Sequence, residues 1–223
     1  MFLPDVKHCL QSMDTENMDK VHFCRSLNVE YPEKNIFFRL GGNVFKTSIS
    51  QEEKLSFGIT ARSAFALCFP RGAWRLVKIS EFTANGILLE DGSVLKGKIF
   101  SDLVAGRNAL WFGAVTVGEK IVSARDLLDK VSDRAIYDAV ASETADAAMD
   151  MIFALAGAEL QRRGAALDKR RYSPGYGDMS LENQKLFFDL LDMSTIGISL
   201  TEHCYMTPEK SVTAVAGVTL HNN

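Results

Sequence analysis

The clearest hydrophobic pattern in the chain is a run of apolar, β-branched and aromatic residues over 109–117, Ala-Leu-Trp-Phe-Gly-Ala-Val-Thr-Val. Asn108 and Gly118 bound this run. A run of this length without polar alternation is typical of a strand that is buried on both faces. We therefore predict a strand over 109–117 in the centre of a sheet.

A helical period follows this strand. Apolar positions recur about every 3.6 residues, Ser132 can cap the start, and Arg162, Arg163 and Gly164 are typical of the end. The pattern predicts a helix over 132–163, about 45 Å long at ~1.5 Å per residue, against which the sheet packs. The positions that carry the period are Ile136, Val140, Ala147, Met151, Leu155 and Ala158.

Two pairs of shorter apolar runs predict β-hairpins. In each pair the runs are separated by residues that supply the positive φ angles of a tight turn. The first pair is 35–40 and 43–49 around Gly41-Gly42, and the second is 86–89 and 94–95 around Asp91-Gly92.

The C-terminal part predicts a loop over 168–179, a helix over 181–191 capped by Ser180, a strand over 196–201 and a last strand over 211–220. Strands and helices mix without regular βαβ alternation. This order favours an α+β fold with a largely antiparallel twisted sheet packed against a long helix and shorter helices. At 223 residues, a single domain over 1–223 is the expectation.

Composition excludes several classes of function. The net charge is −3 and the basic residues are scattered, which is not the charge pattern of a nucleic-acid-binding protein. The longest apolar stretch, 151–158, is far shorter than the ~20 residues that cross a bilayer. The four cysteines form no CxxC pair and the N-terminus lacks a signal-peptide pattern, so we expect a cytoplasmic protein with reduced thiols.

Two segments resemble known binding motifs, one for nucleotide triphosphates and one for metal ions, but neither has the complete pattern. The segment 92–98 matches most of a phosphate-binding loop, but Ile99 stands where a magnesium-binding Ser or Thr is needed and no helix is predicted to follow. Glu202, His203 and Cys204 are adjacent, and consecutive residues of a strand point to opposite faces. We therefore expect neither a nucleotide triphosphate site nor a metal site.

The segment 170–178, Arg-Arg-Tyr-Ser-Pro-Gly-Tyr-Gly-Asp, has the densest unusual chemistry. Proline fixes one φ angle and glycine opens others, so the loop can bring backbone groups close to a ligand. An arginine can hold a carboxylate, and Tyr172 and Tyr176 can offer an aromatic face to a purine or a sulfonium. The alternative is a packed surface connection whose tyrosines cover helix ends.

This loop and the sequence after it resemble the activation domain of cobalamin-dependent methionine synthase. The resemblance covers about residues 85–223 and is more diffuse in the part before the loop. Residues 1–80 add little to it. Five ordered submotifs carry it: Arg171 with Pro174, Gly175 and Tyr176; Leu190-Leu191-Asp192; Gly197-Ile-Ser-Leu-Thr-Glu202; Met206-Thr-Pro208; and Lys210-Ser-Val212.

The resemblance implies that the loop binds S-adenosylmethionine. It implies Arg171 near the methionyl carboxylate, the Ser173 backbone near the adenine, Pro174 and Gly175 in the bend, and Tyr176 beside the ligand. It implies no catalytic residue on the protein itself.

The family also uses an acidic residue on the long helix that precedes the loop. Alignment without gaps indicates Asp146, with Glu143 and Asp150 about one turn to either side on the same face. The alternative is a solvated helix face. The family domain continues past the last strand with a tyrosine-bearing segment, whereas this sequence ends at Asn223. We therefore expect one wall of the pocket to be absent, supplied by the partner, or built from the N-terminal residues.

The sequence lacks the Asp-x-His-x-x-Gly pattern with which cobalamin-binding domains ligate cobalt. By resemblance, we expect a reactivation subunit that presents S-adenosylmethionine to cobalamin carried by a separate methionine synthase subunit, with a flavodoxin- or ferredoxin-type reductant. One alternative is a non-catalytic docking module that regulates a corrinoid methyltransferase without binding S-adenosylmethionine. Another is a methyltransferase that acts on a different corrinoid protein.

Overall fold

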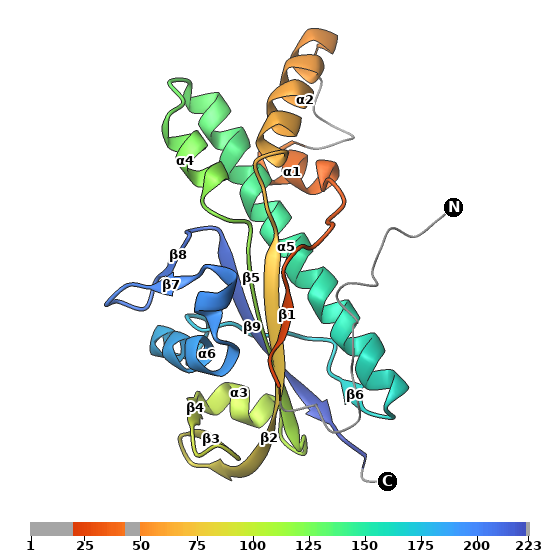
Figure 1. The fold of residues 1–223 in the computed structure, drawn as a ribbon, viewed down its shortest axis with the longest axis vertical. Helices are drawn as coiled ribbons and strands as arrows, with labels where there is room; N and C mark the ends of the chain where they lie inside the picture. The colour runs from red at the N-terminus through yellow and green to blue at the C-terminus, as the bar shows by residue number, and fades with distance from the viewer. Residues whose placement is uncertain (1–19, 43–49, 222–223) are drawn as a thin grey trace.

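A computed structural model describes residues 20–42 and 50–221 (Figure 1). Its centre is an antiparallel sheet of strand order β4-β3-β2-β5-β9-β6, in which β1 also pairs with β2. The strands of this sheet are β1 (His22–Cys24), β2 (Arg71–Thr83), β3 (Gly86–Leu89), β4 (Val94–Lys96), β5 (Ala109–Thr116), β6 (Ala166–Leu167) and β9 (Ser211–Thr219).

Helices cover both faces of the sheet, and a two-stranded antiparallel sheet lies beside it (Figure 1). The predicted α+β fold is confirmed. The remaining elements are α1 (Glu33–Arg39), α2 (Gln51–Phe65), α3 (Lys98–Leu103), α4 (Lys120–Asp126), α5 (Val131–Arg162), the 3₁₀ turn Leu181–Asn183, α6 (Gln184–Leu191), the 3₁₀ turn Met193–Ile196, and the strands β7 (Ser199–Leu200) and β8 (Met206–Thr207).

The strand β5 is central, as predicted, because every one of its residues is buried and it pairs with β2 on one side and β9 on the other. Successive side chains of a strand point to opposite faces. Trp111 accordingly packs with α5 residues such as Ile152, whereas Phe112 packs on the other face against Phe187 of α6 at a ring distance of 5.0 Å. The two cores on either side of β5 hold α5 and α6 against one sheet.

The predicted long helix and the second hairpin are confirmed, with one difference in detail. Helix α5 begins at Val131 after Lys130, and no side-chain hydrogen bond caps it, so the expected cap by Ser132 is wrong. Strands β3 and β4 pair around the turn at Asp91-Gly92, as predicted. The last helix and strand also lie where expected, with Ser180 accepting a hydrogen bond from the Glu182 amide at 3.2 Å.

The first predicted hairpin is wrong over 35–39, which belongs to α1. Residues 43–49 lie outside the described residues. Burial of Ile36 and an edge-on contact between Phe37 and Phe57 of α2, with ring centroids 6.3 Å apart, stabilise a helix although the residues favour strand. Sequence reasoning also missed α2, although Ser50 and Glu53 form a capping box at its start.

Two other expectations need correction. The predicted strand over 196–201 is only Ser199–Leu200, because a 3₁₀ turn runs to Ile196 and Gly197 has a φ of +77°. The expectation that no helix follows the loop-like segment 92–98 is wrong, because helix α3 begins at Lys98, the last residue of this segment. Ile99 nevertheless offers no hydroxyl for a metal ion, so the phosphate-loop pattern stays incomplete.

Gly113 lies under the Trp111 indole, and a Cβ at this position would overlap that ring. We expect Gly113→Ala to lower the free energy of unfolding by about 1–3 kcal/mol, because a buried indole must move in a well-packed core. Gly58 of α2 is a matched control, since nothing lies within 4 Å of a Cβ there. Gly58→Ala is expected to raise stability by about 0.5–1 kcal/mol.

Denaturant unfolding of the two variants beside the wild type measures both values. Equal stability of Gly113→Ala and the wild type would contradict the packing described for Trp111.

Candidate functional site

The loop that follows β6 is attached to the free edge of β9. The Asp168 amide donates to the Gly217 carbonyl at 2.9 Å, and Tyr172 exchanges two backbone hydrogen bonds with Val215 at 2.9 and 2.8 Å. One step further, the Ser173 hydroxyl donates to the Thr213 carbonyl at 2.7 Å. The segment 168–173 therefore follows β9 as an irregular edge strand and is positioned by the sheet.

The Pro-Gly-Tyr bend begins where this edge pairing ends. Pro174 is buried, and Gly175 has a φ of +95°, which favours glycine. The Gly175 amide donates to the Met179 carbonyl at 2.7 Å, and this closes the bend. Tyr176 is 77% exposed at the tip.

The two tyrosines of the loop have different surroundings. The ring of Tyr172 packs edge-on against Phe100 of α3, at a ring distance of 5.2 Å, and belongs to the core on that face of the sheet. Tyr172 is therefore not available as an open aromatic face. Tyr176 is the tyrosine of this loop that a ligand can reach.

Arg171 points to the opposite face of the sheet, toward α5. Its Nη2 lies 2.5 Å from Oδ1 of Asp150, and its guanidinium lies 4.9 Å from the centre of the Phe153 ring. About a quarter of the Arg171 side chain is exposed, against 71% of the Asp150 side chain. The guanidinium is thus held by one solvent-exposed carboxylate and one aromatic face, and part of it is open to solvent.

Asp146 lies one helical turn before Asp150 on the same face of α5. Arg39 of α1 pairs with Asp146, at 3.2 Å, and also with the largely buried Glu143. Burial raises the pKa of the Asp146 carboxyl above its ordinary value and the charge of Glu143 raises this pKa further, whereas Arg39 and Arg171 lower it. Two arginines and three acids therefore form one charged face, as the helical spacing of the acids predicts.

The structure thus brings Arg171 and Asp146 to one face, with the bend formed by Ser173, Pro174 and Gly175 following directly in the chain. Sequence reasoning missed Arg39, because residues 35–40 were expected to be a strand. It also missed Phe153 as the ring under Arg171. The spacing of Asp150 four residues after Asp146 was the signal for its place on this face.

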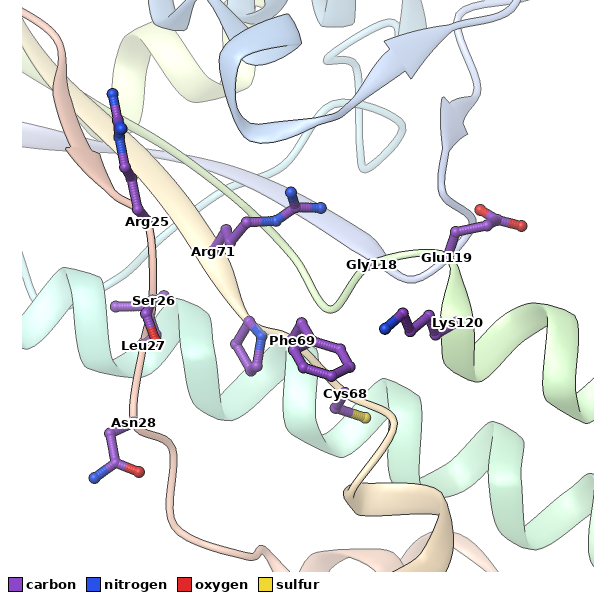
Figure 2. Close-up of a pocket in the computed structure, with 11 residues that line it drawn as sticks. Arg25, Ser26, Leu27, Asn28, Cys68, Phe69, Arg71, Gly118, Glu119 and Lys120 are labelled. Carbon is purple, nitrogen blue, oxygen red and sulfur yellow. The ribbon is translucent and has the colours of Figure 1, made fainter.

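The described part of the molecule includes two hollows that could hold a ligand. One, of about 400 Å³, is lined by Asn35, Phe38, Arg39 and Glu143 and adjoins the acidic face of α5 through Arg39. The other, of about 570 Å³, shares no lining residue with the 171–176 loop (Figure 2). Geometry alone therefore does not select the Arg171 loop as a ligand site.

Comparison with known proteins bears on whether the Arg171 loop or one of these hollows is the ligand site. The family model described as the vitamin B12 dependent methionine synthase activation domain matches residues 154–221. A solved structure, the MetH reactivation domain bound to AdoHcy, matches with a TM-score of 0.58 and 16% identity, covering 95% of this chain and 84% of that chain. The resemblance to the methionine synthase activation domain is confirmed. No curated protein matches the chain.

The family match and the structural match support different statements. The activation-domain match includes the Arg171 loop and the last strand, so these carry the family's sequence features. The structural match shows that the chain has the fold of the MetH reactivation domain, and because its identity is only 16%, it shows the fold alone. Neither match tests a residue of the site.

Two classes of feature are not found in the part of the chain that the structure describes. Across residues 20–42 and 50–221, no helix is long and apolar enough to span a bilayer. The same ranges contain no cluster of three or more His, Cys, Asp or Glu side chains that could hold a metal ion.

The charge balance on α5 gives a direct test of the site's electrostatics. Because Arg39 lowers the pKa of Asp146, we expect Arg39→Met to shift this pKa further upward. Titration of the carboxyl ¹³C resonances by NMR measures the shift. Lys34→Met on the same helix is a matched control, since Lys34 is exposed and takes part in no ion pair among the described residues. If the measured pKa of Asp146 is unchanged or lower in Arg39→Met, the assignment of Arg39 as the partner of Asp146 is contradicted.

Proposed function

We propose that this chain binds S-adenosylmethionine between the Pro-Gly-Tyr bend and the acidic face of α5. In this proposal it is a reactivation subunit, which supplies the methyl group that restores methylcobalamin on a separate methionine synthase subunit. The observation that carries the proposal is the Arg171–Asp150 pair beside the bend, in a loop that matches the activation-domain family.

The Arg171–Asp150 pair has the charges that an amino acid requires. A guanidinium binds an α-carboxylate through paired hydrogen bonds, and a carboxylate accepts hydrogen bonds from an α-ammonium. The methionyl end of S-adenosylmethionine carries both groups. It can therefore replace the internal ion pair with two new ones and leave no charge unpaired.

The cost of opening the pair is small. An ion pair between solvent-accessible side chains contributes only about 0–1 kcal/mol to stability, and most of the Asp150 side chain is exposed. Phe153 keeps the Arg171 guanidinium in place when the carboxylate is exchanged. The internal Arg171–Asp150 pair thus has the same charges as the two pairs that the amino acid would form.

The remaining contacts of the proposal use the bend. Gly175 and Pro174 fix a backbone path beside which the adenine lies, near Ser173. Tyr176, exposed at the tip, offers its ring to the ligand. Asp146 and Asp150 place negative charge near the positive sulfonium. No side chain is required as a general acid or base.

The chemistry proposed for the complex is a methyl transfer. The partner's cobalamin, reduced by one electron from a flavodoxin- or ferredoxin-type reductant, would supply the acceptor for the methyl group. Arg171 and the Pro-Gly-Tyr bend would hold the donor, and the electron pair of the broken carbon–sulfur bond would stay on the sulfur of S-adenosylhomocysteine. The role of this chain is to hold the donor in line with the acceptor, which is catalysis by proximity and orientation.

A second candidate is a docking module that regulates a corrinoid methyltransferase without binding S-adenosylmethionine. The observation that favours it is the same ion pair, since Asp150 of the chain itself already satisfies the charge of Arg171. The third, a methyltransferase that serves another corrinoid protein, keeps the same ligand site and differs in the partner alone.

Isothermal titration calorimetry separates the first two candidates. We expect the wild-type chain to bind S-adenosylmethionine and Arg171→Ala to weaken binding at least about tenfold, because one charge-assisted bidentate contact is lost. Arg170→Ala is the matched control, an adjacent exposed arginine for which the described residues show no ion pair. Its affinity should equal that of the wild type.

Absence of heat with the wild type would favour the docking module. Equal losses in Arg170→Ala and Arg171→Ala would contradict the specific role of Arg171 and leave only a general charge effect.

A further inference from the structure

The hollow of about 570 Å³ is lined by cations that the proposed function does not use (Figure 2). It lies where the end of β1, the connection from α2 to β2 and the turn from β5 to α4 meet. Its lining includes Arg25, Arg71 and Lys120 but a single acid, Glu119. This is a local excess of two positive charges in a chain whose net charge is −3.

Arg71 has an unusual environment for a cation. Its Nε is buried without a hydrogen-bond partner, and Arg71 forms no ion pair with any described residue. Its guanidinium fits beside two glycines of positive φ, since a Cβ would stand 3.1 Å from Nη2 at Gly197 and 3.8 Å from it at Gly118. A partly desolvated guanidinium without an acceptor is costly, and an anion in the hollow would compensate it.

Lys120 lies across the same space. Its Nζ lies 4.6 Å from the centre of the Phe69 ring, and no described acid pairs with it. Figure 2 shows Arg71 and Lys120 extending toward each other near Phe69, with the Glu119 carboxylate turned away. Two cations from different elements therefore converge on one volume, whereas the Arg25 side chain extends away from them in this view.

We propose that this hollow is a binding site for a small phosphate monoester. A phosphate monoester carries about two negative charges at neutral pH, which matches the local excess, and its oxygens can accept from both Arg71 and Lys120. The volume of about 570 Å³ lies in the range of small-molecule pockets and greatly exceeds what a bare phosphate fills. Leu27, Phe69 and Pro70 give the organic part an apolar wall.

The site is separate from the proposed S-adenosylmethionine site, because the two share no residue. The proposal therefore does not rest on the proposed function. Each can fail while the other holds, and one pair of titrations distinguishes them.

Calorimetry of the full chain with phenyl phosphate tests this proposal, with inorganic phosphate and phenol as reference probes at constant ionic strength. We expect saturable binding of phenyl phosphate that is tighter than binding of inorganic phosphate, and no binding of phenol. Arg71→Met and Lys120→Met should each weaken phenyl phosphate binding by roughly tenfold or more, as expected when a charge-assisted hydrogen bond is lost. S-adenosylmethionine affinity should be the same in Lys120→Met as in the wild type.

Lys185→Met is the matched control for loss of one charge, because Lys185 is exposed on α6 and outside the hollow. Thermal melting without ligand checks the folding of each variant. If Arg71→Met does not fold, Lys120→Met decides alone, since Lys120 is exposed. The proposal is overturned by an absence of saturable phenyl phosphate binding, or by Lys120→Met binding as tightly as Lys185→Met.

Discussion

The pair of backbone hydrogen bonds between Tyr172 and Val215 is the contact on which the proposed site depends. It fixes the loop to β9, and β9 is itself fixed along its length to the buried strand β5. Because neighbours in an extended segment point to opposite faces, the same pairing sends Tyr172 into the core beside Phe100 and Arg171 toward α5. The direction of the Arg171 guanidinium thus follows from strand pairing in the centre of the molecule.

Helix α5 complements that guanidinium with a row of carboxylates. Glu143, Asp146 and Asp150 recur at helical spacing, and Arg39 and Arg171 approach them from two distant parts of the chain. Glu143, at one end of the row, is largely buried and paired with Arg39, whereas Asp150, at the other end, is open to solvent. An exchangeable pair at the exposed end, supported by a fixed one further in, is a physical arrangement that suits reversible binding of a zwitterion.

Much of this architecture follows from sequence periodicity. The strand over 109–117 and the long helix were predictable because their patterns extend over many residues and because burial enforces them. The fold of α1 was not predictable in this way, since Ile36 and Phe37 favour strand and it is their packing in the tertiary structure that stabilises the helix. The short β7 illustrates the same limit, because Gly197 and a 3₁₀ turn interrupt a run that alternates like a strand.

The candidate site likewise combines residues that the sequence indicated with residues that it did not. Local chemistry in 171–176 and the acidic spacing on α5 indicated which residues to examine. Their partners could not be read from sequence, because Arg39 and Phe153 reach the site only through tertiary packing. The hollow around Arg71 is a further case, as its lining comes from three segments with no shared motif.

A crystal structure of the chain with S-adenosylmethionine would show directly whether the Arg171 loop binds this donor. We expect ligand density between the Pro-Gly-Tyr bend and α5, with the methionyl carboxylate on Arg171 and the Arg171–Asp150 contact opened. An empty bend in a crystal saturated with the ligand, with Arg171 still paired to Asp150, would contradict it.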